Sequence, residues 1–238
     1  MPARNQKLIN NEFYHITLRR VGESLLFKDI NDHYRGIFSI YEFNTLTPVT
    51  IRERRNARLR IKQEIKKGTR DQDLCVDTRD QLVEILLFCL MPNHIHLLLK
   101  QLKEGGISKY INKIGAGYPA YFKKKYDIDS RGHFFQDRFN AVHIKTDEQL
   151  IMAFIYIHTN PISLIEPGWK EKKIKNPEKT IRFLEKDYRW SSFWDYIGTK
   201  NFSSITERKL FINLIGGEQK CKELIEDWIK SKNQRPGL

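Results

Sequence analysis

Four short segments of the chain carry the hydrophobic pattern of β-strands. Residues 13–20 partly alternate between apolar and polar positions, which is typical of a strand. Residues 83–90 and 94–100 are almost continuously apolar and are separated only by Met91, Pro92 and Asn93, a strand–turn–strand signal. Residues 134–145 predict a loop followed by a fourth strand.

Apolar residues at helical spacing predict helices between these strands. Segment 29–41 would be a helix despite Gly36, and segment 108–126 would be another. In segment 147–160, Thr146 is an expected N-cap, and Pro161 ends the helix because the residue before a proline avoids the α conformation. The face that we expect the first helix to bury is Ile30, Tyr34, Ile37, Phe38 and Tyr41.

The order of these elements, β-α-β-β-α-β, predicts an α+β protein of the ferredoxin-like type. Such a fold is an antiparallel sheet with helices on one face. Here it is followed by a helix that carries Tyr156 and by a helical C-terminal extension. We expect residues 1–161 to form one domain, with a basic helical insertion near 48–80, and residues 162–238 to pack on it.

The composition points to a polyanionic partner. The chain of 238 residues has 42 Lys and Arg against 29 Asp and Glu, a formal net charge of +13. Such an excess favours nucleic acid through counterion release, although a soluble basic protein would look the same. Three scattered cysteines exclude a disulfide scaffold and a zinc finger. No run approaches the roughly 20 apolar residues of a membrane span, so we expect an intracellular, soluble protein.

His94 and His96 are the first candidate functional residues. Since side chains alternate along a strand, both imidazoles leave the same face while Ile95, Leu97 and Leu99 serve the core. Two imidazoles side by side on a strand form half of a metal site. The same pair could also be two unrelated histidines on a half-buried face.

Tyr156 and Asn160 form the second candidate pair. They lie one helical turn apart, at the edge of the apolar stripe of their helix. A boundary tyrosine with a solvated hydroxyl, and an asparagine that caps the helix, would explain both residues without any chemistry.

Four segments resemble the single-tyrosine HUH transposases, in particular the REP-associated tyrosine transposase branch. The run FCLMPNHIHLLLK is similar to the His–hydrophobic–His motif, and YIHTNPI is similar to the segment that carries the nucleophilic tyrosine. GHFFQDRFNAVHI and YRWSSFWDY resemble two further stretches of that family. The resemblance covers roughly residues 10–200, in the same order.

The resemblance implies a metal-dependent endonuclease and strand transferase that acts on single-stranded, hairpin-forming DNA. It also implies a cytoplasmic protein of a bacterial-type cell, active at the nucleoid. It implies that Tyr156 is the nucleophile and forms a 5′-phosphotyrosine, and that His94, His96 and Asn160 hold Mg²⁺ or Mn²⁺. A metal that binds the scissile phosphate would help a weak phenol nucleophile. Two imidazoles suit Mn²⁺ better than Mg²⁺.

The expected DNA contacts are basic residues. Arg138 and Lys145 flank the expected last strand and are candidates near the scissile strand; the candidates for gripping a hairpin backbone are Arg52, Arg54 and Arg55. Each could equally be a solvated surface charge. A monomer and a homodimer are both compatible with the sequence.

Other functions remain compatible with the pattern. One is a domesticated protein that binds nucleic acid without cutting it. A relaxase or replication initiator would share the chemistry but place its tyrosine before the histidines or add a helicase region. A zinc hydrolase would need a further ligand, and neither His133, His143 nor His158 has a convincing spacing for it.

Overall fold

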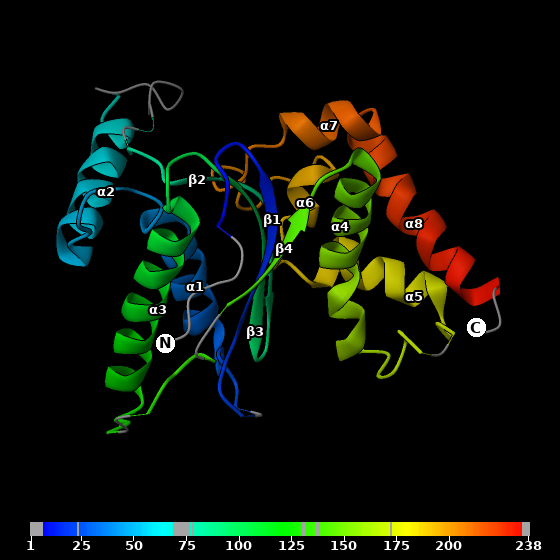
Figure 1. Cartoon of the computed structure of the whole chain (residues 1–238), viewed down its shortest axis with the longest axis horizontal. Helices are drawn as coiled ribbons and strands as arrows, with labels where there is room; N and C mark the ends of the chain where they lie inside the picture. The colour runs from blue at the N-terminus through cyan, green and yellow to red at the C-terminus, as the bar shows by residue number, and fades with distance from the viewer. Residues whose placement is uncertain are drawn as a thin grey trace.

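A four-stranded antiparallel sheet runs through the centre of the computed structural model (Figure 1). The structure describes residues 7–22, 24–68, 77, 79–129, 132–136, 139–171 and 173–234. The strands are β1 (Phe13–Arg19), β2 (Val83–Met91), β3 (His94–Gln101) and β4 (Asn140–Ile144), in the order β2-β3-β1-β4. Each neighbouring pair is antiparallel. The ferredoxin-like prediction is therefore confirmed.

Helices α1 (Ile30–Glu42) and α3 (Gly106–Lys125) cover one face of the sheet. Gly117 allows the close approach of α3 to the residues that follow α1, because a Cβ there would lie 2.3 Å from Cζ of Phe43. The predicted buried face of α1 is confirmed at Ile37, which is buried, and is wrong at Ile30 and Tyr34, which are exposed; Ile40 is buried in addition. Gly36 also packs on the core, where an added Cβ would lie 2.8 Å from the Phe27 ring.

The other face of the sheet is covered by α4 (Asp147–Thr159) and by the residues after it. Their side chains share one apolar cluster with Leu87 and Leu98 of the sheet. None of the helices in the described part of the chain is long and apolar enough to cross a membrane. The elements after α4 are a 3-10 helix (Asn160–Leu164), α5 (Pro177–Arg182), a π-helical turn (Phe183–Asp187), α6 (Phe193–Tyr196), α7 (Lys209–Ile215) and α8 (Glu218–Gln234).

Helix α4 begins as predicted and ends differently. The Thr146 hydroxyl accepts a hydrogen bond from the Gln149 backbone N–H, which caps the first turn. At the other end Asn160, the residue before Pro161, keeps an α conformation with φ −51° and ψ −39°. The chain tightens into the 3-10 helix instead of leaving the helical region. Asn160 therefore continues the helical path and lies one turn after Tyr156.

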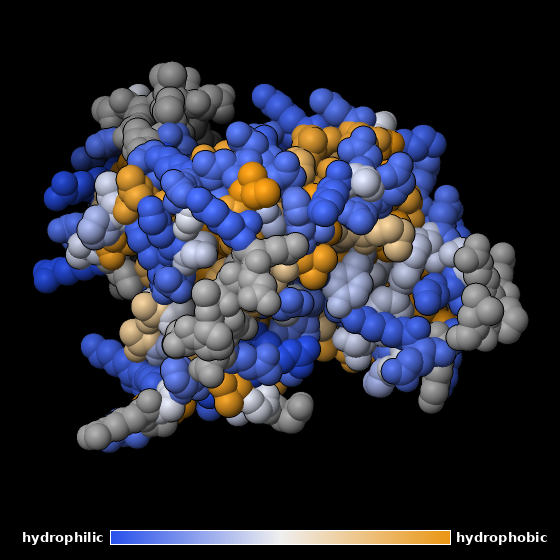
Figure 2. Space-filling model, in the orientation of Figure 1, coloured by the Kyte–Doolittle hydropathy of each residue, from blue (hydrophilic) through white to orange (hydrophobic). Residues whose placement is uncertain are grey.

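Helix α2 (Ile51–Lys66) is the basic helix predicted after Pro48. It lies beyond α1 and α3, on the side of the molecule away from α4 (Figure 1). Most of its described side chains are exposed, Leu59 included. In Figure 2 hydrophilic side chains project from this edge of the molecule. The prediction that this helix lies on the surface is confirmed.

Candidate active site

Two neighbouring strands direct a row of polar side chains to the face that α4 covers. In the antiparallel register His94 pairs with Arg19, and His96 pairs with Thr17. Because side chains alternate along a strand, these residues leave one face while Ile95 and Leu97 enter the core on the other. The predicted orientation of the two histidines is confirmed.

The polar row forms one wall of a cavity of about 400 Å³. The last turn of α4 and the segment after it form the opposite wall, so that His94, His96, Tyr156 and Asn160 meet in one place. The lining residues are Thr17, Arg19, His94, His96, Gln136, Asn140, Tyr156, Asn160, Ser163 and Lys170.

His94 has one ring nitrogen fixed and the other available. Its Nδ1 lies 2.6 Å from Oδ1 of Asn93, and since a carbonyl oxygen only accepts, Nδ1–H is the donor. The Nε2 atom of neutral His94 therefore carries a lone pair. Burial lowers the pKa of His94 to about 4, and the charges of Arg19 and Lys170 add to the effect, so the ring is neutral at pH 7.

His96 is held in a similar way from the neighbouring strand. Its Nδ1 lies 2.9 Å from Nε2 of His15 and 3.3 Å from Oγ1 of Thr17. Its Nε2 is buried and has no hydrogen-bond partner. Burial lowers the pKa of His96 to about 2, and the neighbouring His94, His15, Lys170 and Arg19 lower it further. When Nδ1 of neutral His96 carries the proton, Nε2 is a buried electron-pair donor without a recipient.

The ring of Tyr156 lies edge-on to the rings of His96 and His15. Its ring centroid is 5.5 Å from that of His96 and 5.6 Å from that of His15. The side chain is 39% exposed, so the phenol can be reached from solvent. The Asn160 amide group donates from Nδ2 to the backbone carbonyl of Tyr156 at 2.8 Å, which leaves Oδ1 to face the cavity.

These donors fit a divalent ion. His94 Nδ1, His96 Nδ1 and Asn160 Nδ2 are each fixed by a hydrogen bond, so that Nε2 of both histidines and Oδ1 of Asn160 face the cavity, as ligands held by outer-shell partners do in metal sites; Lys170 Nζ lies 3.4 Å from this Oδ1. Two imidazoles and one amide oxygen suit a transition ion such as Mn²⁺ better than Mg²⁺. In the described residues no three His, Cys, Asp or Glu side chains are grouped to hold a metal, and His15 supports His96 instead of joining it as a ligand.

The cavity is electropositive. Arg19 and Lys170 both line it, and none of the described lining residues is a carboxylate. Both cations contribute to the lowered pKa of His94 and His96. A cavity lined by positive charge attracts an anion such as a phosphate group.

Comparison with known proteins finds a family match for the middle of the chain. Residues 49–160 match the family model described as transposase, IS200-like. The match covers slightly less than half of the chain. The structure is also similar to a solved one, a REP-associated tyrosine transposase bound to a REP hairpin, with 17% sequence identity and a TM-score of 0.47 over 88% of this chain and 96% of that chain. No curated protein matches the chain.

The matched transposase segment contains His94, His96, Tyr156 and Asn160 but not the whole cavity. His15 and Arg19 come from β1, before the segment, and Lys170 follows it. Sequence reasoning missed these three residues. Positions 15, 17 and 19 are the polar positions of an alternating strand, and this pattern is a usable signal for His15 and Arg19. Nothing in the sequence around Lys170 distinguishes it from the other lysines of the region.

The expected DNA-binding residues lie elsewhere. Lys145 follows the end of β4, where Ile144 pairs with Phe13, whereas His94 pairs with Arg19 at the other end of β1. The structure therefore does not bring Lys145 to the cavity. Arg52 is exposed on α2, Arg54 lies 3.6 Å from Glu42, and α2 is far from α4. Arg55 also belongs to α2, and Arg138 lies outside the described residues.

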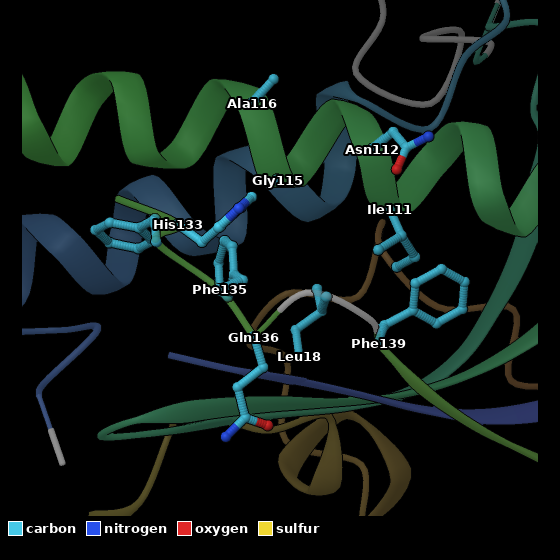
Figure 3. Close-up of a pocket in the computed structure, with 10 residues that line it drawn as sticks. Leu18, Ile111, Asn112, Gly115, Ala116, His133, Phe135, Gln136 and Phe139 are labelled. Carbon is cyan, nitrogen blue, oxygen red and sulfur yellow. The ribbon is translucent and has the colours of Figure 1, made fainter. Parts of the chain in front are cut away.

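A second cavity of about 380 Å³ lies next to the first, between α3 and the segment before β4 (Figure 3). Gln136 lines both cavities. In Figure 3 Phe135 points toward α3 whereas Gln136 points the opposite way, toward the sheet. Gln136 thus connects the aromatic surroundings of this second cavity with the polar lining of the first.

Proposed function

We propose that this protein cleaves and rejoins single-stranded DNA at hairpin-forming sequences through a covalent 5′-phosphotyrosine on Tyr156. One observation carries the proposal. A solvent-accessible phenol lies edge-on to His96, whose Nε2 is buried without a partner, in a cavity whose described charged residues are cations. Cleavage of a phosphodiester uses these features together: a nucleophile, a metal ion held by electron-pair donors such as His96 Nε2, and positive charge beside the phosphate.

The residues of the cavity have separate roles in this mechanism. Arg19 attracts the scissile phosphate, and His15, Thr17 and Asn93 hold the two histidines in their neutral, donor-ready forms. A divalent ion bound by His94, His96 and Asn160 would act as a Lewis acid on the phosphate. The bond from Tyr156 Oη to phosphorus forms as the bond from phosphorus to O3′ breaks. Another 3′-hydroxyl can reverse the step, because the phosphodiester bond energy is kept in the phosphotyrosine.

The preference for hairpin-forming DNA is the finer part of the proposal. It is supported by the resemblance of four sequence segments to the REP-associated branch and by the net charge of +13. A transposase acts where the DNA is, so the proposed location is the cytoplasm. The exposed basic helix α2 is a second place where a DNA backbone could bind, at a distance from the cavity.

The proposal is tested with a library of single-stranded hairpin oligonucleotides labelled at the 3′ end, in the presence of Mn²⁺. Cleavage on the 3′-oxygen side leaves the labelled fragment attached to the protein, and this adduct survives a denaturing gel. Tyr156→Phe should give no adduct, and addition of EDTA should prevent it in the wild type. Tyr34→Phe, which changes a tyrosine of similar exposure on α1, should leave it unchanged.

Two outcomes would reject the proposal. If the wild type gives no adduct across the library but still binds the oligonucleotides, the protein is a binding protein that does not cut. If Tyr156→Phe retains the adduct, the nucleophile is another residue.

A further inference from the structure

Lys170 brings a positive charge to the hydroxyl of Tyr156 from outside the matched transposase segment. Its Nζ lies 3.4 Å from Tyr156 Oη and 3.4 Å from Asn160 Oδ1. The same ammonium lies 4.6 Å from the centroid of the Tyr156 ring. The family match ends at residue 160, so it does not include this lysine.

The backbone that carries Lys170 is firmly anchored. Trp169 is buried and packs edge-on against Trp228 of α8, with ring centroids 5.4 Å apart. The Glu166 carboxylate accepts hydrogen bonds from the backbone N–H groups of Lys175 and Asn176, which ties the turn to the segment that precedes α5. The exposed lysine therefore projects from a fixed turn, and this limits where its ammonium group can lie.

The surroundings of the ammonium are unusual for a structural lysine. Its two acceptors are a phenol oxygen and an amide oxygen, and the described residues that line the cavity include no carboxylate. A neutral pair of acceptors does not balance a full positive charge. Negative charge develops on Tyr156 Oη only when the phenol gives up its proton during reaction, and a fixed cation beside that atom lowers the barrier to such a step.

We infer that Lys170 is a catalytic residue that stabilises the phenolate of Tyr156 during attack, an inference that rests on the function proposed above. In the step, the phenolic proton passes to solvent and the Oη–phosphorus bond forms. The phosphorus–O3′ bond breaks, and the departing O3′ takes a proton from solvent. Lys170 keeps its own proton throughout and acts through its charge.

The first test separates chemistry from binding. The probe is the oligonucleotide that the wild type cleaves fastest in the hairpin library. Lys170→Met should slow single-turnover adduct formation by about 100-fold, the order found when one stabilising donor is removed from an active site. Affinity for the uncleaved oligonucleotide, measured in the Tyr156→Phe background, should change no more than about threefold.

Two further variants serve as controls for this result. Lys170→Arg keeps the charge and should recover adduct formation to within about tenfold of the wild type. Lys173→Met removes a lysine from the same exposed segment and should leave the rate within about twofold of the wild type. A Lys170→Met rate equal to that of Lys173→Met overturns the inference. So does a loss that the change in affinity fully explains.

The second test distinguishes whether Lys170 acts on the attacking oxygen, Tyr156 Oη, or on the leaving oxygen, O3′. In an oligonucleotide with a 3′-bridging phosphorothiolate, the leaving group is a thiolate that needs no proton. If Lys170 acts on the nucleophile, Lys170→Met should be slow on this probe too. If the defect disappears, the lysine acts on the leaving group, and the inference is wrong. A wild type that forms no adduct on any probe overturns the proposed function together with this inference, whereas an active wild type with an unaffected Lys170→Met variant overturns the inference alone.

Discussion

His15 and His96 are in ring-to-ring contact across neighbouring strands, with Nε2 of one lying 2.9 Å from Nδ1 of the other. Burial lowers the pKa of His15 to about 4, so both rings are neutral at pH 7. One of the two nitrogens must then donate and the other accept. When His96 donates from Nδ1, its buried Nε2 is left as a lone-pair donor for a metal.

The His15→Phe substitution removes the hydrogen bond to His96, whereas the phenyl ring still fills the space of the imidazole. We expect the affinity for Mn²⁺, measured by calorimetry or by electron paramagnetic resonance, to fall by about 10- to 100-fold, as is usual when an outer-shell partner is lost. His143→Phe is the matched control, because His143 lies on β4 and contacts Glu12 and Tyr14 instead of the cavity. Equal Mn²⁺ affinities of the two variants would show that His15 does not prepare His96.

Alanine substitutions at Gly115 and Gly117 of α3 should change the free energy of unfolding in opposite directions. A Cβ at Gly115 meets nothing within 4 Å, so Gly115→Ala should stabilise the protein by about 0.5–1 kcal/mol through helix propensity. A Cβ at Gly117 would lie 2.3 Å from the ring of Phe43, so Gly117→Ala should destabilise it by about 1–3 kcal/mol. Urea denaturation measures both. The same sign for both variants would contradict the packing of α3 described above.

His158 should make the protein sensitive to acid. Its Nε2 lies 2.8 Å from Oγ of Ser192, and complete burial lowers its pKa to about 3. The unfolded chain binds a proton at this residue near pH 6.5 and the folded protein does not. The contribution of neutral His158 is therefore fully present above that pH and is lost as the pH falls from 6.5 toward 3.

We expect this residue alone to cost about 3 kcal/mol of stability at pH 4.5, two pH units below the ordinary histidine value. The free energy of unfolding should be measured at pH 7 and pH 4.5 for the wild type and for His158→Met. The variant should lose less stability between the two pH values by about that amount. Identical losses would place the acid sensitivity elsewhere.

The extension after residue 161 should unfold together with the sheet. Phe211 of α7 is fully buried, and its ring lies 5.3 Å from that of Phe154 on α4. Phe211→Ala should reduce the free energy of unfolding by about 3–5 kcal/mol in a single transition. Leu59→Ala, on the exposed face of α2, should change it by no more than about 0.5 kcal/mol. Two separate transitions in the Phe211→Ala variant would mean that the extension folds independently.

Local periodicity predicted much of the fold. The alternation of residues 13–20, the two apolar runs around Pro92 and the cap at Thr146 gave the order of strands and helices that the structure has. The predicted buried face of α1 is right at Ile37 but wrong at Ile30 and Tyr34, and Gly36, a weak helix former by propensity, lies on the packed side of the helix. Its lack of a side chain decides how closely Phe27 packs, and no count of apolar residues contains that information.

The sequence by itself determined which face of β3 presents His94 and His96, because that depends only on the two-residue period of a strand. It also placed Tyr156 and Asn160 one turn apart, because that depends only on the helix. The tertiary structure decided that these pairs meet, that His15 supports His96 from 81 residues away, and that Lys170 reaches Tyr156. These contacts join residues on different elements, and their positions follow from strand register and from the packing of α4 and the extension on the sheet.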